Sequence, residues 1–200
     1  MTRSIVQIGP DDQGKQMSLA EFDHAEGLEG YLYELSKGVI TVMDVPDRKH
    51  LFQLNAARKQ LFAYWASHSE QIHTIAFGGE CKVLLAGAES ERHPDLAIYK
   101  SAPDDEEELW AHWIPDVSIE IVSRSSHHRD YVEKREEYLQ FGIREYWIID
   151  AVPQQMMALR RSAGRWVEKI VQANDMYHTR LLPEFEFNLA PIFEAARAAR

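Results

Sequence analysis

The stretch from Trp113 to Asp150, WIPDVSIEIVSRSSHHRDYVEKREEYLQFGIREYWIID, constrains the fold of this chain more than any other part. Its pattern predicts a strand, a short polar turn, an amphipathic helix and a second buried strand, in that order. Val117, Ile119 and Ile121 alternate with polar residues, so they share one face of the first strand. A right-handed crossover through the helix would place the two strands side by side in one sheet. The unit therefore predicts an α/β fold built around these strands.

Glu120 lies between apolar residues of the first strand. A buried charge without a partner costs several kcal/mol, which is comparable with the whole stability of a small domain. Glu120 therefore needs a partner, which is either a cationic side chain, a metal ion or a network of hydrogen bonds.

The helix of this unit carries a second unusual residue. Ser125 or Ser126 can cap its start, and Gly142 is well placed to end it. Lys134 falls at the edge of the apolar arc, one turn before Tyr138. From that position a lysine either reaches back toward the preceding strand or extends its ammonium group into water, and the position alone leaves both alternatives open.

The composition fits one well-packed domain of 200 residues, of which 45% are hydrophobic. The 22 basic and 32 acidic side chains give a formal charge of -10. That charge argues against general electrostatic binding of nucleic acid, but it allows a local basic surface beside an acidic metal site.

The single cysteine, Cys81, excludes an intrachain disulfide framework and fits a reducing cytoplasm. No apolar run approaches the roughly 20 residues that cross a membrane, so we expect a soluble, cytoplasmic protein without a membrane partner.

We expect a mobile leader over residues 1–17 and a single domain over 18–200, because the first stretch is polar and no later linker is evident. Ser18 and Glu21 have the spacing of a capping box, which predicts a short helix. The remaining predicted elements are a hairpin over 31–43, a helix over 47–69, strands at 71–77 and 81–85 joined by a Gly78-Gly79 hairpin turn, a strand over 93–99, a solvated acidic loop at 104–108, a hairpin over 156–171, an extended segment at 181–187 and a helix over 191–200.

The carboxylates suggest a metal pocket. Asp116 and Glu120 are four residues apart on one strand, so their Cα atoms lie roughly 13 Å apart and they cannot share an ion. Asp95 belongs to a neighbouring strand and can lie beside Glu120. With Glu34, which could instead be a hairpin-edge charge in water, these acids would form an oxygen-rich pocket for Mg²⁺ or Mn²⁺. Lys134 above such a pocket would suit hydrolysis of a phosphodiester.

Several basic side chains follow the first strand of the central unit. They are Arg124, His127, His128, Arg129 and Arg135. One interpretation is a solvated loop and helix start, and the other is contact with phosphates at a helix N-terminus. The spacings HExxH and CxxC are absent, which argues against a zinc site.

Five segments of the chain together resemble the Uma-type family of restriction endonucleases, which have the PD-(D/E)xK nuclease fold. The resemblance extends from about Ser18 to Phe193. Its segments are YELSKGVI at 33–40, HPDLAIY at 93–99, PDVSIEIVS at 115–123, DYVEKREEYLQFGIREYWIID at 130–150 and LLPEFEFNLAPIF at 181–193. The 130–150 segment is quite specific, whereas each short segment alone is weak.

The resemblance implies a restriction-endonuclease-like α/β fold, with a mixed, curved β-sheet flanked by helices. It implies that Asp95 is the aspartate of the nuclease motif, that Glu120 is its second acid and that Glu34 is an additional N-terminal glutamate. A motif lysine two residues after Glu120 would stand at position 122, where this chain has Val122. The resemblance places that lysine on the following helix instead, at Lys134.

Our leading hypothesis is a Mg²⁺-dependent or Mn²⁺-dependent DNA endonuclease that uses two acids and a lysine. The alternative is a catalytically inactive nuclease-fold protein that binds nucleic acid or another protein, which the charge of -10 keeps open. The sequence does not distinguish DNA from RNA as the substrate. It also leaves open a homodimer, in which two copies would cut two strands.

Overall fold

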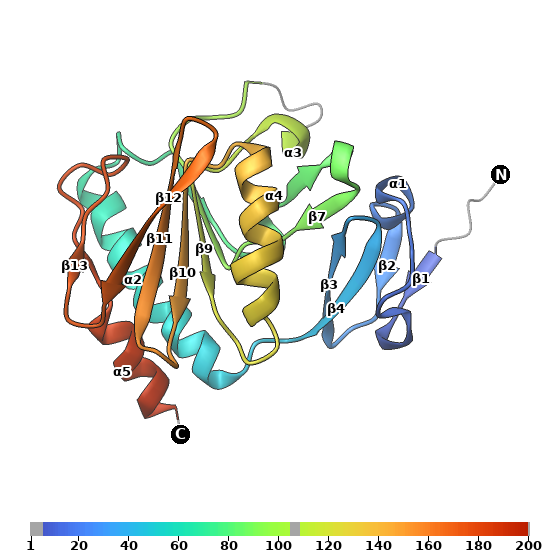
Figure 1. Cartoon of the computed structure of the whole chain (residues 1–200), viewed down its shortest axis with the longest axis horizontal. Coiled ribbons are helices and arrows are strands. Elements are labelled where there is room, and N and C mark those ends of the chain that lie inside the picture. Colours follow the sequence, from blue (N-terminus) through green and yellow to red (C-terminus); the bar gives the residue numbers. More distant parts are fainter. Residues whose placement is uncertain (1–5, 105–108, 200) are drawn as a thin grey trace.

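The structure is a computed structural model that describes residues 6–104 and 109–199. A six-stranded sheet forms its larger part (Figure 1). The order across this sheet is β12-β11-β10-β9-β8-β5. The strands are β5 (Thr74–Ala76), β8 (Leu96–Tyr99), β9 (Val117–Ile121), β10 (Glu145–Asp150), β11 (Gln155–Ser162) and β12 (Arg165–Gln172).

The predicted strand–helix–strand unit forms the middle of this sheet. Strands β9 and β10 are parallel, with Ile119 opposite Trp147, and every residue of both strands is buried. The connecting helix consists of a π-helical turn, Arg129–Glu133, followed by α4, Lys134–Phe141. Gly142 ends it with a φ of 105°, a conformation that glycine adopts without a steric penalty. The predicted strand, helix, strand and glycine stop are confirmed, whereas the π-helical turn is not part of the prediction and neither Ser125 nor Ser126 caps the helix with its side chain.

The alternation of side chains along β10 divides the core into two layers. Trp147 and Ile149 pack with residues of α2 (Arg48–Ser67) and α5 (Ala190–Ala198). Tyr146 and Ile148 point to the other face, where they pack against α4. Both faces of the sheet are therefore covered by helices (Figure 1). Because both faces are buried, the sequences of the central strands are largely apolar.

A second sheet lies beside the first and has the order β4-β3-β7-β6. The predicted hairpin is confirmed: its strands are antiparallel, and Lys37 and Gly38 form the turn with φ values of 50° and 76°. The bounds of this sheet are β3 (Tyr31–Ser36), β4 (Val39–Asp44), β6 (Val83–Leu85) and β7 (Ser90–Arg92). The predicted capping box at Ser18 is also confirmed, and it begins the short helix α1 (Leu19–Phe22).

The described part of the expected leader, residues 6–17, has regular structure. Strand β1 (Val6–Ile8) pairs in parallel with β2 (Ala25–Gly27), and the Gly14 amide donates a hydrogen bond to the Ile40 carbonyl at 2.9 Å. Ile8 is buried in a small apolar cluster with residues of the hairpin. A short apolar segment thus attaches this polar stretch to the second sheet. The division into a leader and a single domain over 18–200 stays a prediction.

Two element predictions are wrong. Strands β5 and β6 do not form a hairpin, because β5 pairs with β8 in the larger sheet and β6 pairs with β7 in the smaller one. The glycine-rich segment between them is a 3-10 turn, Gly78–Glu80, at which the chain passes from one sheet to the other. Residues 181–187 are mostly bends and a turn rather than extended chain, because Glu184 has a φ of 64° and the Phe185 amide donates to the Leu182 carbonyl.

The remaining elements are short. They are η1 (Pro10–Asp12), η3 (Ala86–Ala88), α3 (Leu109–His112), β13 (Met176–Tyr177) and β14 (Phe187–Asn188). The expected acidic loop at 104–108 lies outside the described residues except for Asp104.

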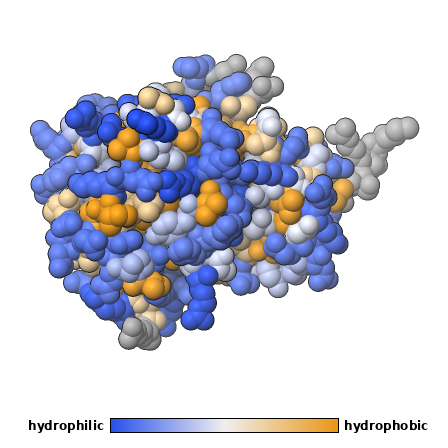
Figure 2. Space-filling view, in the orientation of Figure 1, coloured by the Kyte–Doolittle hydropathy of each residue, from blue (hydrophilic) through white to orange (hydrophobic). Residues whose placement is uncertain are grey.

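None of the helices in the described ranges is long and apolar enough to cross a membrane. The face of the molecule in Figure 2 is largely hydrophilic, with separate small hydrophobic areas.

Candidate active site

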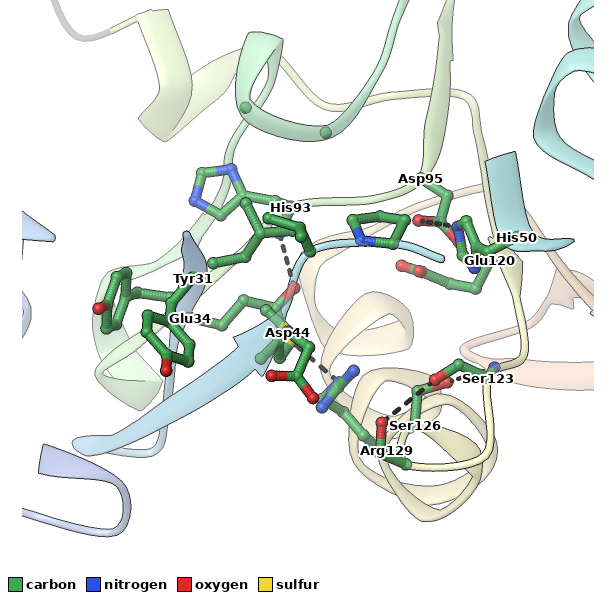
Figure 3. Close-up of a pocket in the computed structure, with 18 of the residues that line it drawn as sticks. Tyr31, Glu34, Asp44, His50, His93, Asp95, Glu120, Ser123, Ser126 and Arg129 are labelled. Carbon is green, nitrogen blue, oxygen red and sulfur yellow. Dashed lines mark hydrogen bonds and ion pairs between the residues drawn. The ribbon is translucent and has the colours of Figure 1, made fainter. Parts of the chain in front are cut away.

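Asp95 and Glu120 come together through the pairing of two strands. Strands β8 and β9 are antiparallel with Leu96 opposite Ile119, so the preceding Asp95 lies across from Glu120. Asp95 stands one residue before β8, where its side chain can leave the sheet toward a cavity. Figure 3 shows both acids on one side of this cavity, next to His50.

Asp95 is held by one side chain and one backbone group. Its Oδ1 lies 3.2 Å from Nε2 of His50, and its Oδ2 accepts a hydrogen bond from the Ile121 amide at 2.7 Å. Burial alone would raise the pKa of Asp95, but the hydrogen bond and charge of His50 outweigh it and lower the pKa below its ordinary value. Asp95 is therefore kept ionised in a largely buried position.

His50 is a site residue that the sequence did not predict. It lies in the first turn of α2, where its amide donates a hydrogen bond to the capping carboxylate of Asp47 at 2.7 Å. The sequence favours a capping or packing role for such a histidine, and its contact with Asp95 spans 45 residues. No short motif signals a contact over that distance, so only the fold reveals it.

Glu120 is almost fully buried, and one of its two oxygens makes all of its hydrogen bonds to the described residues. Oε1 accepts from Nζ of Lys134 at 2.9 Å and from the Tyr138 hydroxyl at 2.8 Å. Within the described part of the chain, Oε2 accepts none. Burial raises the pKa of Glu120 to about 8, against the opposing charge of Lys134 and with the help of nearby Asp95. The free oxygen makes Glu120 available to a further ligand.

Lys134 reaches back from the helix to the strands, and its side chain is 3% exposed. Besides Glu120, its Nζ contacts Oε1 of Glu34 at 3.1 Å. Of the two orientations that the sequence left open, the buried one is present. The two carboxylates raise the pKa of Lys134 although burial alone would lower it, so the ammonium group stays charged.

Glu34 contacts Lys134, and both of its oxygens face positive or donating groups. Oε2 lies 3.1 Å from the Arg92 guanidinium and 3.7 Å from Arg129, while Oε1 also accepts from the His93 amide at 3.1 Å. Burial would raise the pKa of Glu34, but the surrounding charges lower it to about 2. Glu34 thus belongs to a cationic environment and not to the acidic pair.

The fully buried Arg92 connects this environment to the helix. Its Nε donates to Glu137 at 2.7 Å, and one terminal nitrogen contacts Glu133 at 3.1 Å. Because Glu34, Arg92 and Glu137 come from β3, β7 and α4, the network joins the second sheet to the helix that carries Lys134. The position of Lys134 relative to Glu120 depends on this connection.

The folded chain should lose stability in acid through Glu34. Its pKa is about 2 in the fold against an ordinary value of 4.5, so ionised Glu34 contributes on the order of 3 kcal/mol above pH 4.5. This contribution is lost as the pH falls toward 2. We expect the gap in free energy of unfolding between wild type and Glu34→Gln, measured with urea, to narrow from pH 7 to pH 3. The exposed Glu136→Gln is the control, and an equal gap at both pH values would contradict the prediction.

The π-helical turn before Lys134 holds a further buried carboxylate in the cavity wall. Asp130 is 1% exposed, and its Oδ2 accepts a hydrogen bond from the Ser126 hydroxyl at 2.5 Å. Among the described residues, its Oδ1 has no hydrogen-bond partner. Burial raises the pKa of Asp130 to about 6. Such turns often occur at functional sites, and this one places Asp130 and Lys134 on the same cavity.

The structure separates the four candidate nucleic-acid contacts. Arg129 turns inward to Glu34, whereas Arg124, His127 and His128 are exposed. His127 and His128 lie 3.9 Å from Asp150 and Glu133, respectively. Arg135, the fifth basic residue of the predicted cluster, pairs with Glu168 on β12 and does not line the cavity. Arg124 lines both the main cavity and a neighbouring cavity of about 770 Å³, which His127 also lines.

The main cavity has a volume of about 790 Å³ and lies between the two sheets. Asp95, Glu120, Lys134 and Arg129 form part of its wall, and residues of β3, β4 and the start of α2 form another part. Figure 3 shows Asp95 and Glu120 on one side of the cavity and Tyr31 and Glu34 on the other. Four partly exposed apolar side chains lie on that second part: Tyr31, Leu32, Val45 and Leu51. The cavity is large enough for a small ligand or a segment of a polymer.

The residues present fit a magnesium-type cation with two protein ligands. Mg²⁺ is commonly bound by one or two carboxylates together with waters and substrate phosphates. Asp95 and Glu120 supply two adjacent carboxylates, including the free Oε2 of Glu120. No cluster of three or more acidic, histidine or cysteine ligands occurs within residues 6–104 and 109–199. Glu34 is not a third ligand in this arrangement, because its oxygens face Lys134, Arg92 and Arg129.

Comparison with known proteins identifies the family and the fold of this chain. The model of the Uma2 family, described as "Putative restriction endonuclease", matches residues 19–190, which include all four predicted catalytic residues. The chain belongs to this family. A "putative nuclease belonging to DUF820" from Anabaena variabilis has the same fold, with a TM-score of 0.71. The two sequences are 17% identical, over 90% of this chain and 99% of the other. A search of curated proteins finds no match.

Membership of the Uma2 family confirms the resemblance seen in the sequence, and the structural match confirms the restriction-endonuclease-like α/β fold with its mixed, curved sheet. Family and fold together support a nuclease. The match begins at residue 19, so it includes β3 with Glu34 and extends through β14.

Proposed function

We propose that this chain is a Mg²⁺-dependent or Mn²⁺-dependent endonuclease that hydrolyses DNA phosphodiester bonds. The observation that carries the proposal is the buried contact of Lys134 with Glu120 at 2.9 Å, beside Asp95 in the wall of a large cavity. Two acids and a lysine in that arrangement suit phosphoryl transfer, because the reaction gathers negative charge on the phosphate oxygens.

In this proposal, Asp95 and Glu120 hold the metal ion. Mg²⁺ bound there supplies positive charge to the phosphate and makes a neighbouring water molecule more acidic. His50 and the Ile121 amide fix the direction of the Asp95 carboxylate. The Tyr138 hydroxyl donates a hydrogen bond to Oε1 of Glu120, which leaves Oε2 free to bind the ion.

Lys134 orients the attacking water and stabilises the negative charge that develops on it. Its ammonium group stays protonated between Glu120 and Glu34, so it acts as a hydrogen-bond donor and not as a base. Glu34 assists through Lys134, whose ammonium group it contacts together with Glu120. Arg124, His127, His128 and Arg129 contact the phosphate backbone around the cavity.

The first test is a calorimetric titration with Mn²⁺ of wild type, Asp95→Asn and Asp116→Asn, followed by incubation with plasmid and with single-stranded DNA. Asp116 is the matched control, because it also follows a proline but bonds to Lys100 and Arg144 away from Glu120. We expect wild type and Asp116→Asn to bind Mn²⁺ and to nick DNA, and Asp95→Asn to do neither. Cleavage by Asp95→Asn at the wild-type rate would overturn the assignment.

The alternative function is that of an inactive nuclease-fold protein that binds nucleic acid or another protein. The observations in its favour are the ion pairs that already occupy Lys134 and the formal charge of -10. The same titration separates the two, since a binding module gives neither Mn²⁺ affinity nor nicking. A homodimer would present two such sites to the two strands of a duplex. Light scattering with and without DNA measures the molar mass and so shows whether the chain forms a dimer.

A further inference from the structure

One stripe of helix α2 faces the cavity. His50, Leu54 and Arg58 recur every four residues, so they lie on the same side of the helix, and all three line the cavity. Arg58 comes eight positions after His50, which corresponds to about 12 Å along the helix axis. His50 contacts Asp95, so Arg58 lies farther along the same wall.

Arg58 is fixed by an aromatic ring and not by an acid. Its guanidinium carbon lies 3.9 Å from the centre of the Phe77 ring. Its Nε is buried and has no hydrogen-bond partner among the described residues. A buried donor without a partner is rare and costs free energy. The contact with the ring restrains the guanidinium group, and its terminal nitrogens have no hydrogen-bond partner among the described residues, so they are available to a ligand.

Arg58 differs in this respect from other cations of the cavity. Lys134 and Arg129 each contact Glu34, and Lys82 lies 3.0 Å from Asp23. Within the described ranges, Arg58 has no carboxylate at ion-pair distance. Burial lowers its pKa, while the more distant Glu80 and Asp95 act in the opposite direction. A guanidinium remains charged under these conditions.

The space beside Arg58 is open. The turn after Phe77 begins with Gly78 and Gly79, and a Cβ atom at either glycine would meet nothing within 4 Å. Both glycines line the cavity together with Arg58. An anion can therefore approach the guanidinium from the cavity without displacing a side chain of this turn.

We propose that Arg58 binds a phosphate of the nucleic-acid backbone next to the phosphate that is cleaved. The inference rests on the proposed function, because that function places the reacting phosphate at Asp95 and Glu120. Planar guanidinium groups suit phosphate oxygens, since two donors can bind one phosphate. The position farther along α2 assigns Arg58 to a flanking phosphate. Arg58 is thus a substrate-binding residue that extends the site beyond the acids.

The test compares wild type, Arg58→Gln, Arg58→Lys and Arg48→Gln in binding to fluorescently labelled DNA, single-stranded and duplex, with EDTA present to prevent hydrolysis. Arg48 is the matched control, because it lies on the same helix over the Phe52 ring but does not line the cavity. We expect Arg58→Gln to weaken binding about tenfold and to reduce the salt dependence by roughly one counterion. Arg58→Lys should keep the salt dependence and lose part of the affinity.

Thermal unfolding of each variant shows whether the fold is retained. Equal affinity and equal salt dependence for wild type and Arg58→Gln would overturn the proposal, and so would the absence of DNA binding by wild type. Cleavage with Mn²⁺ is measured separately, where Arg58→Gln should raise KM more than it lowers kcat. Loss of binding without any cleavage would keep Arg58 as a backbone contact and reject the endonuclease. Cleavage of DNA by wild type, together with equal DNA binding by wild type and Arg58→Gln, would support the endonuclease and reject the role of Arg58.

Discussion

Replacing Lys134 with methionine is expected to lower the rate of DNA cleavage by about two to three orders of magnitude, the usual effect of removing one donor that stabilises developing charge. Lys134 supplies the ammonium group nearest to the acidic pair, at 2.9 Å from Glu120. Arg92 and Arg129 also face Glu34, but neither contacts Glu120 among the described residues. Among the described residues, Lys134 is the one lysine or arginine that forms an ion pair with Glu120, so we expect no other cation to replace it. The measurement is single-turnover cleavage with Mn²⁺ at saturating enzyme.

The methionine variant also removes a charge from between two buried carboxylates, so stability must be separated from catalysis. Lys134→Arg provides the control, because it keeps the positive charge but replaces a compact ammonium group with a planar fork. We expect Lys134→Arg to unfold close to the wild-type temperature and still to cleave slowly. A folded Lys134→Met with full activity would reject the lysine mechanism.

The central part of the fold could be predicted because its signals are local. The strand–helix–strand unit over 113–150 has apolar alternation, a helical arc and a glycine stop within one stretch of sequence. The signals that predict the hairpin at Lys37-Gly38 also lie within one short stretch of sequence. The Gly78-Gly79 pair carries a similar local signal, yet it joins two different sheets. A turn signal marks where the chain bends, but the pairing partner depends on contacts from elsewhere in the chain.

The candidate site was predictable to the extent that it follows from strand geometry. The spacing of Asp116 and Glu120 prevents them from sharing a metal ion, so Asp95 on a neighbouring strand is the predicted partner of Glu120. The contacts of His50 and Arg92 did not follow from any such rule. Arg92 stands in the polar run ERH, where a solvated charge is the ordinary interpretation, but the fold surrounds it with acids from two other elements. Long-range contacts of this kind need the tertiary structure.

Replacing Arg92 with methionine is expected to lower the free energy of unfolding by about 3–5 kcal/mol, because it leaves buried carboxylates without their cation. Arg92 is fully buried and contacts Glu34, Glu133 and Glu137 at 3.1, 3.1 and 2.7 Å. Urea unfolding at neutral pH measures the loss. Arg144→Met is the matched control, since the exposed pair with Asp116 should contribute no more than about 1 kcal/mol.

A second variant distinguishes the cost of unpaired charges from the cost of lost packing. If unpaired carboxylates cause the instability, the double variant Arg92→Met with Glu137→Gln should be more stable than the sum of the two single changes predicts, because one buried charge is removed together with its partner. Additive losses would instead assign the role of Arg92 to packing.

The same variants report on the site, because Glu34 without Arg92 retains Lys134 as its closest cation. Stronger competition from Glu34 would draw Lys134 away from Glu120, so DNA cleavage should fall in Arg92→Met even at temperatures where the variant is fully folded.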